Sequence, residues 1–255
     1  MNNLDDIEDY EKLGVTNFLF PLRNYSIGYE DFTFEELGKI ERDVYILANR
    51  LLTDSDLDAF EKLVIPKNVR GFIIEDTGLY TLLKDKGYIL ISFQNHLNAN
   101  YRTCNYWLDY FDSLVISTDI TYEEIDTNLN KAKKPLVFYT VGSPMIMYSR
   151  RHLVSNYYLQ KNLSPKKEVA IADPKGEFTF RLKETNYGTA CFDTRVLDAR
   201  EEATSLDDEK ILFYLIDTES LTKEEVVSAL KGESLKNTTK GFLEKKTVYR
   251  IGDLK

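Results

Sequence analysis

The chain has 255 residues, of which 43% are hydrophobic and 29% are charged, so it is long and apolar enough to build one large domain or two small ones around a real core. Its formal net charge of -9 and its sequence pI near 5.0 exclude a protein that attracts polyanions by its bulk charge. Any contact with nucleic acid must therefore come from a local basic patch or from a partner.

The N-terminal segment MNNLDDIEDYEKL is acidic and lacks the apolar core of a signal peptide. No apolar stretch approaches the roughly 18 residues that a spanning helix needs, so we expect a cytoplasmic protein with no membrane partner. The only cysteines, Cys104 and Cys191, are far apart and lack C-x-x-C spacing. They can build neither a disulfide framework nor a four-cysteine metal site, and we expect no metal and no cofactor in this chain.

Apolar runs rich in Val, Ile, Leu and Phe alternate with segments of helical spacing, which is typical of β/α units around a parallel sheet. Capping signals mark several helix starts: Thr33 with Glu36, Thr53 or Ser55, and Thr121 with Glu124. The predicted strands are 17–22, 43–51, 71–76, 88–93, 113–118, 135–140 and 211–219.

This pattern breaks near residue 164. Strand-like alternation with turn signals at DPKGE and ETNYG predicts antiparallel hairpins within 164–200, centred on 168–198, and Gly188 is expected in a turn with positive φ. Residues 232–255 show no eighth unit and are expected to form an irregular tail. We predict a single α/β domain over 1–255, TIM-barrel-like and either closed or partly open. An open doubly wound sheet is the alternative, without the G-x-G-x-x-G or P-loop of a nucleotide-binding version.

In a β/α barrel, the residues that bind and react lie at the carboxyl ends of the strands. The polar residues there form a rim that could hold a small anionic ligand or an RNA phosphate. These candidates are Arg23, Asn49, Arg50, Glu75, Asp76, Gln94, Asn95, His96, Thr118 and Asp119, and, in the segment MYSRRHLV after the sixth strand, Tyr148, Ser149, Arg150, Arg151 and His152.

Each candidate also has a structural interpretation. Glu75 and Asp76 are weak candidates for an acid/base pair, since adjacent strand residues point to opposite faces, which favours ion pairing or helix capping. His96 and His152 lack a defined carboxylate partner, which favours hydrogen-bonded histidines over metal ligands. Arg150 and Arg151 fit one solvated and one ion-paired arginine on a first helical turn. Cations are mildly unfavourable near a helix start, so the pair alternatively indicates a local reason such as an anion. No serine or cysteine lies in a nucleophile elbow.

Several segments together resemble the collagenase-like U32 peptidase family, in particular its short members that pair with a longer one in low-GC Gram-positive bacteria. The resemblance covers most of the chain and rests on GFIIEDTGLYTLLKDKG, ISFQNHLNANYRTCNYW, LVISTDITYEEI, GSPMIMYSRRHLVSNYY and ETNYGTACFDTRVLDA. It implies a β/α barrel. It also implies, beside the peptidase label, a link to iron–sulfur proteins that hydroxylate tRNA, ribosomal RNA or a ubiquinone precursor.

The chain departs from the cluster-binding members where they place a cysteine after the serine–arginine segment, because His152 stands there. The resemblance therefore predicts the cluster-free small subunit of a prephenate-dependent tRNA wobble-uridine hydroxylation complex. An iron–sulfur cluster would then lie only in a larger, cysteine-bearing paralogue, and tRNA or a small anionic metabolite would be further partners. The alternatives are a true peptidase and a non-enzymatic barrel that binds a metabolite or a partner.

Overall fold

The largest sheet of the computed structural model has five parallel strands that follow one another in chain order. The structure describes residues 1–94, 96–164, 166–176 and 178–245. Every residue of the second strand is buried, as expected of a strand that is covered on both faces. The five strands are β1 (Phe18–Pro21), β2 (Val44–Ala48), β3 (Val69–Ile74), β4 (Ile89–Ser92) and β5 (Ser113–Leu114).

A second sheet continues the parallel series. Its strand β6 (Leu136–Gly142) pairs in parallel with β12 (Ile211–Ile216), and a parallel bridge between Val115 and Val137 links it to the first sheet. β11 (Val196–Asp198) pairs antiparallel with β6 and parallel with β13 (Thr238–Thr239). Within the described residues, no pairing joins β12 to β1. The α/β class is therefore confirmed, whereas a barrel, closed or open, stays a prediction.

The helices begin where the capping signals predict. Thr33 with Glu36 and Thr121 with Glu124 form capping boxes, and Thr53 caps its helix together with Asp56. The helices are α1 (Ile7–Glu11), α2 (Phe34–Leu37), α3 (Asp54–Glu61), α4 (Thr77–Leu83), α5 (Tyr101–Trp107), α6 (Tyr122–Lys131), α7 (Leu153–Gln160), α8 (Arg200–Ala203) and α9 (Lys223–Leu230), with 3-10 turns η1 (Leu4–Asp6) and η2 (Asp208–Lys210). In the described part of the chain, none is long and apolar enough to cross a membrane.

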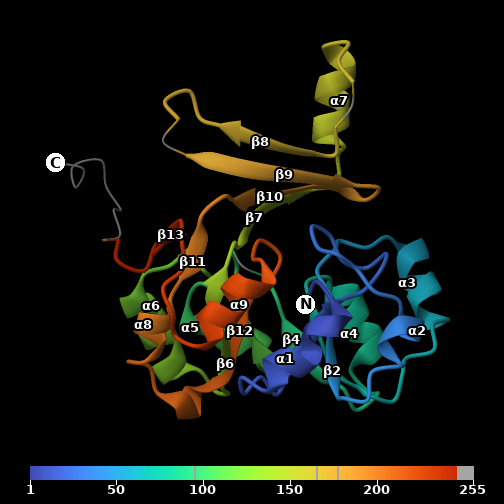
Figure 1. The fold of residues 1–255 in the computed structure, drawn as a ribbon. Helices are drawn as coiled ribbons and strands as arrows, with labels where there is room; N and C mark the ends of the chain where they lie inside the picture. Colours follow the sequence, from blue (N-terminus) through green and yellow to red (C-terminus); the bar gives the residue numbers. More distant parts are fainter. Residues whose placement is uncertain (95, 165, 177, 246–255) are drawn as a thin grey trace.

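An antiparallel sheet, with α7 at one end of its strands, stands apart from the parallel strands (Figure 1). We call residues 145–193 the lobe. Turns after Ala172 and Thr185 join its hairpins where DPKGE and ETNYG predicted them. Gly188 has the expected positive φ, +131°, but it is the first residue of β10 and not a turn residue. The strands run in the order β7 (Met145–Ser149), β10 (Gly188–Asp193), β9 (Thr179–Thr185) and β8 (Glu168–Ala172).

The expectation that MYSRRHLV directly follows the sixth parallel strand was wrong. The chain turns out of β6 at Gly142, whose φ of +136° suits glycine, and β7 then pairs antiparallel with β10. The tail also differs from the expectation where β13 pairs with β11, while residues 246–255 lie outside the described part.

One face of the parallel strands encloses a small apolar cluster. Leu47, Ile73, Ile91, Val115 and Val137 form it, and side chains of β12 pack against it. Their neighbours along each strand belong to the larger cluster on the opposite face, because successive side chains point to opposite sides of a sheet. Strands of both sheets thus contribute side chains to the same small apolar cluster.

Candidate functional site

The ends of β3, β4 and β5 carry a polar cluster around the predicted residues Glu75 and His96. His96 Nδ1 lies 2.7 Å from Asp119 Oδ2, and His96 Nε2 lies 3.2 Å from the carbonyl oxygen of Ile146 in the lobe. Burial raises the pKa of Glu75 to about 7, although nearby His96 lowers it. A carboxyl group that titrates near neutral pH beside an imidazole–carboxylate pair is able to exchange protons with a substrate.

Arg50 and Tyr148, both predicted as ligand-binding, are brought together at the end of β2. The Arg50 side chain is buried, and its Nη2 lies 2.7 Å from Asp56 Oδ1. Its guanidinium carbon lies 3.9 Å from the centre of the Tyr187 ring, and the Tyr148 hydroxyl donates to the Tyr187 carbonyl at 3.1 Å. The ion pair holds the Arg50 side chain in place, and its stack on Tyr187 links the parallel strands to the lobe.

Four other predicted residues have contacts that explain them structurally. Asn49 is fully buried and exchanges hydrogen bonds with the backbone of Ile27, so it holds the loop after β1. Arg23 forms an ion pair with Asp31 at 2.9 Å, and Asp76 caps α4 by accepting a hydrogen bond from the Gly78 N–H at 2.7 Å. Gln94 Nε2 donates to the Glu75 carbonyl at 3.0 Å. Asn95 lies outside the described residues.

The MYSRRHLV segment ends β7 and leads into α7. The side chains of Arg150 and Arg151 are exposed, and in the part of the chain that the structure describes neither has an ion-pair partner. Ser149 Oγ accepts a hydrogen bond from the Arg151 N–H at 3.3 Å. Two adjacent cations thus project from the lobe.

The start of α7 already has an anion from the protein itself, but this anion forms no ion pair with Arg150 or Arg151 among the described residues. Glu184 of β9 is buried and accepts hydrogen bonds from the Val154 N–H at 2.9 Å and the Ser155 N–H at 3.2 Å. It also accepts bonds from the hydroxyls of Ser155 and Thr189, and His152 Nδ1 lies 3.8 Å away. Glu184 therefore satisfies the first amides of α7.

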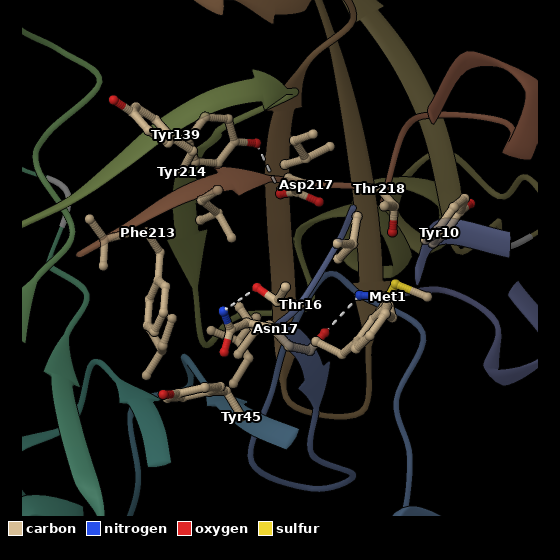
Figure 2. Close-up of a pocket in the computed structure, with 18 of the residues that line it drawn as sticks. Met1, Tyr10, Thr16, Asn17, Tyr45, Tyr139, Phe213, Tyr214, Asp217 and Thr218 are labelled. Carbon is tan, nitrogen blue, oxygen red and sulfur yellow. Dashed lines mark hydrogen bonds between the residues drawn. The ribbon is translucent and has the colours of Figure 1, made fainter. Parts of the chain in front are cut away.

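A cavity of about 550 Å³ lies between β1 and β12 and reaches the small apolar cluster (Figure 2). None of the predicted site residues that the structure describes lines it. Its inner wall includes Ile73, Val115 and Val137, all buried. Thr16, Asn17, Asp208 and Tyr214 are lining residues that are exposed, so they mark its mouth. Both the size and the apolar walls are those of small-molecule sites.

One end of this cavity is polar. The hydroxyls of Tyr29 and Tyr139 each donate to Asp217 Oδ2 at 3.0 Å, and the Glu219 N–H donates to Asp217 Oδ1 at 2.9 Å. Burial raises the pKa of Asp217, while the hydrogen bond from Glu219 opposes this shift. Burial and then Asp217 also raise the pKa values of both tyrosines well above the ordinary value, so these hydroxyls stay protonated.

Asp217, Tyr29 and Tyr139 were not among the residues predicted for a site. The sequence does carry a signal for Asp217, because it directly follows the apolar strand core ILFYLI and so lies at a strand end. Tyr29 and Tyr139 had no such signal: one lies in a loop and the other within a strand that looks uniformly apolar. Only the fold brings these three residues together.

The donor groups of this chain do not fit a four-cysteine iron–sulfur cluster. The chain has two cysteines, and both are buried, Cys104 in α5 and Cys191 in β10. Burial raises the pKa of the Cys104 thiol to about 11 and also raises that of Cys191, which disfavours the thiolate that binds metals. Within the described residues, no group of three or more His, Cys, Asp and Glu could hold a metal ion.

Fold and site thus define an α/β protein with polar strand ends, an apolar cavity and an antiparallel lobe. The family model described as peptidase family U32 matches residues 14–167, more than half of the chain, and the chain belongs to this family. The match includes Glu75, His96 and the arginine pair but ends before Glu184 and Asp217. No curated protein and no solved structure matches the chain significantly.

Proposed function

We propose that this chain is the cluster-free small subunit of a prephenate-dependent complex that hydroxylates the wobble uridine of tRNA in the cytoplasm. Its partner would be a larger, cysteine-bearing paralogue that holds the iron–sulfur cluster. The observation that carries the proposal is the surface of the lobe, which combines two arginines that lack an ion-pair partner among the described residues with many exposed apolar side chains.

The exposed apolar side chains support a partner subunit. Lobe residues supply half of the large hydrophobic side chains that are exposed in the described part of the chain, and Leu159 in α7 is 76% exposed. Apolar groups gathered on one projecting element mark interaction surfaces more often than scattered ones do. These side chains are Ile146, Met147, Leu153, Tyr157, Leu159, Leu163, Ile171 and Phe178.

The arginine pair supports contact with an anion. Arg150 and Arg151 lie on the same lobe as the apolar side chains, and guanidinium groups bind phosphate and carboxylate oxygens through paired hydrogen bonds. With a net charge of -9, the chain would need such a local patch, together with its partner, to contact tRNA. A small anionic metabolite is the other candidate ligand of the pair.

The test is nucleoside mass spectrometry of bulk tRNA from a host strain that lacks this gene. We expect hydroxylated wobble uridine to be lost and to return with the wild-type gene, but not with Arg150→Ala combined with Arg151→Ala. The control is Lys84→Ala with Lys86→Ala, which removes two exposed cations from another surface and should restore the modification. An unchanged nucleoside profile in the deletion strain would overturn the proposal.

A second candidate, a hydrolase in keeping with the family's peptidase label, is favoured by Glu75 and the His96–Asp119 pair. In this version Glu75 would activate a water molecule for attack on a peptide carbonyl. The test is cleavage of a gelatin substrate by the purified protein. Activity that is lost in Glu75→Gln and kept in the exposed control Glu61→Gln would support it, and absence of cleavage by the wild type would reject it.

A further inference from the structure

We propose that the cavity between β1 and β12 binds a small aromatic molecule that carries an amine and no negative charge. This inference is independent of the RNA-modification proposal, because it concerns neither the lobe nor the arginine pair. It rests on the size of the cavity, the nature of its walls and the groups at its polar end.

The walls suit an aromatic ring. Tyr45, Phe93 and Phe213 line the cavity beside the aliphatic side chains of Leu47 and Leu215 (Figure 2). Tyr45 and Phe213 already contact each other edge to face, with ring centres 5.2 Å apart. A ligand ring inserted beside them would gain both apolar burial and edge-to-face contacts. A volume of about 550 Å³ has room for one or two rings.

The polar end offers acceptors. Tyr29 and Tyr139 use their hydroxyl hydrogens on Asp217, so the phenolic oxygens keep lone pairs that accept hydrogen bonds. The Asp217 carboxylate is an acceptor as well. An ammonium or amine group placed there would find a carboxylate and two hydroxyl oxygens, which are the partners that a desolvated cation requires.

A carboxylate or phosphate ligand would find no counterpart. Among the residues that the structure describes, the lining contains Asp208 and Asp217 but no lysine, arginine or histidine. Its other ionisable groups are tyrosine hydroxyls and the amino group of Met1, which donates to the Leu19 carbonyl at 2.8 Å. Burial lowers the pKa of this amine to about 6, although nearby Asp217 raises it, so burial disfavours its charged form. A buried anion without a cation is costly, so the cavity selects against negative charge.

The test uses matched pairs of aromatic probes that share a ring and a chain: tyramine with 3-(4-hydroxyphenyl)propionate, and tryptamine with indole-3-propionate. Saturation-transfer NMR and calorimetry on the whole chain measure binding. We expect saturable binding of at least one amine and at least tenfold weaker binding of its carboxylate partner. Equal or tighter binding of the carboxylates, or no binding of either amine, overturns the proposal.

Two variants locate the probe. Leu215→Trp fills the cavity and should abolish amine binding, whereas the same change at the exposed Leu159 in α7 should leave it unchanged. Tyr139→Phe, which removes one acceptor and leaves the ring in place, should weaken the amine at least fivefold and the carboxylate less. If Leu215→Trp does not fold, Tyr139→Phe alone tests whether the probe binds in the cavity. An unchanged preference for the amine in that variant would show that the probe binds elsewhere and would overturn the proposal.

Discussion

Glu184 shows how a single residue positions the basic segment of the lobe. Burial alone would raise the pKa of this carboxyl, but hydrogen bonds from Ser155, Val154 and Thr189 outweigh burial and lower the pKa. Since the folded-state pKa lies below the unfolded one, the stabilisation is present at neutral pH and is lost as pH falls through the folded-state value. The carboxylate therefore fixes the start of α7 only while it is ionised.

We expect Glu184→Gln to lower the free energy of unfolding by about 2 kcal/mol at pH 7, because the buried donors lose a charged acceptor. The difference from the wild type should shrink in acid. Urea denaturation at pH 7 and pH 4 measures both effects, with the exposed Glu123→Gln as the control. A loss of equal size at both pH values would contradict this role of the charge.

Glu75 is expected to make the folded state less stable as pH rises, whereas Glu184 makes it more stable. Its pKa is raised to about 7, mainly by burial. Between the ordinary glutamate pKa and pH 7, Glu75 is therefore protonated in the folded state and ionised in the unfolded state. Stability must therefore fall as pH rises through this window. Glu75→Gln, which cannot ionise, should remove about 1–3 kcal/mol of that decline between pH 5 and pH 8. Urea denaturation across this range measures it, and identical curves for the variant and the wild type would show that Glu75 titrates normally.

Among the elements, the β9–β10 hairpin holds the end of β7 through a close backbone approach at Gly188. A Cβ atom at this position would lie 2.1 Å from the Ser149 carbonyl oxygen and 2.8 Å from the Arg150 Cα, both of which are backbone atoms. Gly176, in the other turn of the lobe, has a φ of +71°, and a Cβ atom there would have no neighbouring atom within 4 Å. A side chain at Gly176 would introduce backbone strain alone, whereas a side chain at Gly188 would introduce both backbone strain and steric contact.

Gly188→Ala should destabilise the protein by about 3 kcal/mol, from strain and contact together, whereas Gly176→Ala should cost about 1 kcal/mol. Thermal unfolding measures the total loss of stability in each variant. Hydrogen exchange should show the loss of protection confined to residues near 147–160 in Gly188→Ala. Equal costs for the two variants would mean that the hairpin can move away from β7.

At the scale of the whole molecule, the features that could be predicted from the sequence are those that local patterns determine. The strand–helix alternation and the caps at Thr33, Thr53 and Thr121 depend on residues a few positions apart, and the structure confirms them. The cavity and the lobe depend on distant pairings: Tyr29 meets Asp217 across 188 positions at the cavity, and β7 pairs with β10 in the lobe beyond α7, β8 and β9. Hydrophobic periodicity gives no information on such partners.

The parallel strands and the lobe should also differ in how they open. All residues of β2 and β6 are buried, whereas β8 is mostly exposed and α7 buries only Val154. Segments with little buried apolar surface open without global unfolding. We expect amides of α7 and β8 to exchange with opening free energies at least about 3 kcal/mol below those of β2 and β6, whose exchange requires unfolding of the whole chain. Native-state hydrogen exchange at increasing urea measures this gradient. A single opening free energy for all four elements would show that the lobe unfolds only with the rest of the protein, and that its exposed apolar surface is rigidly presented to a partner.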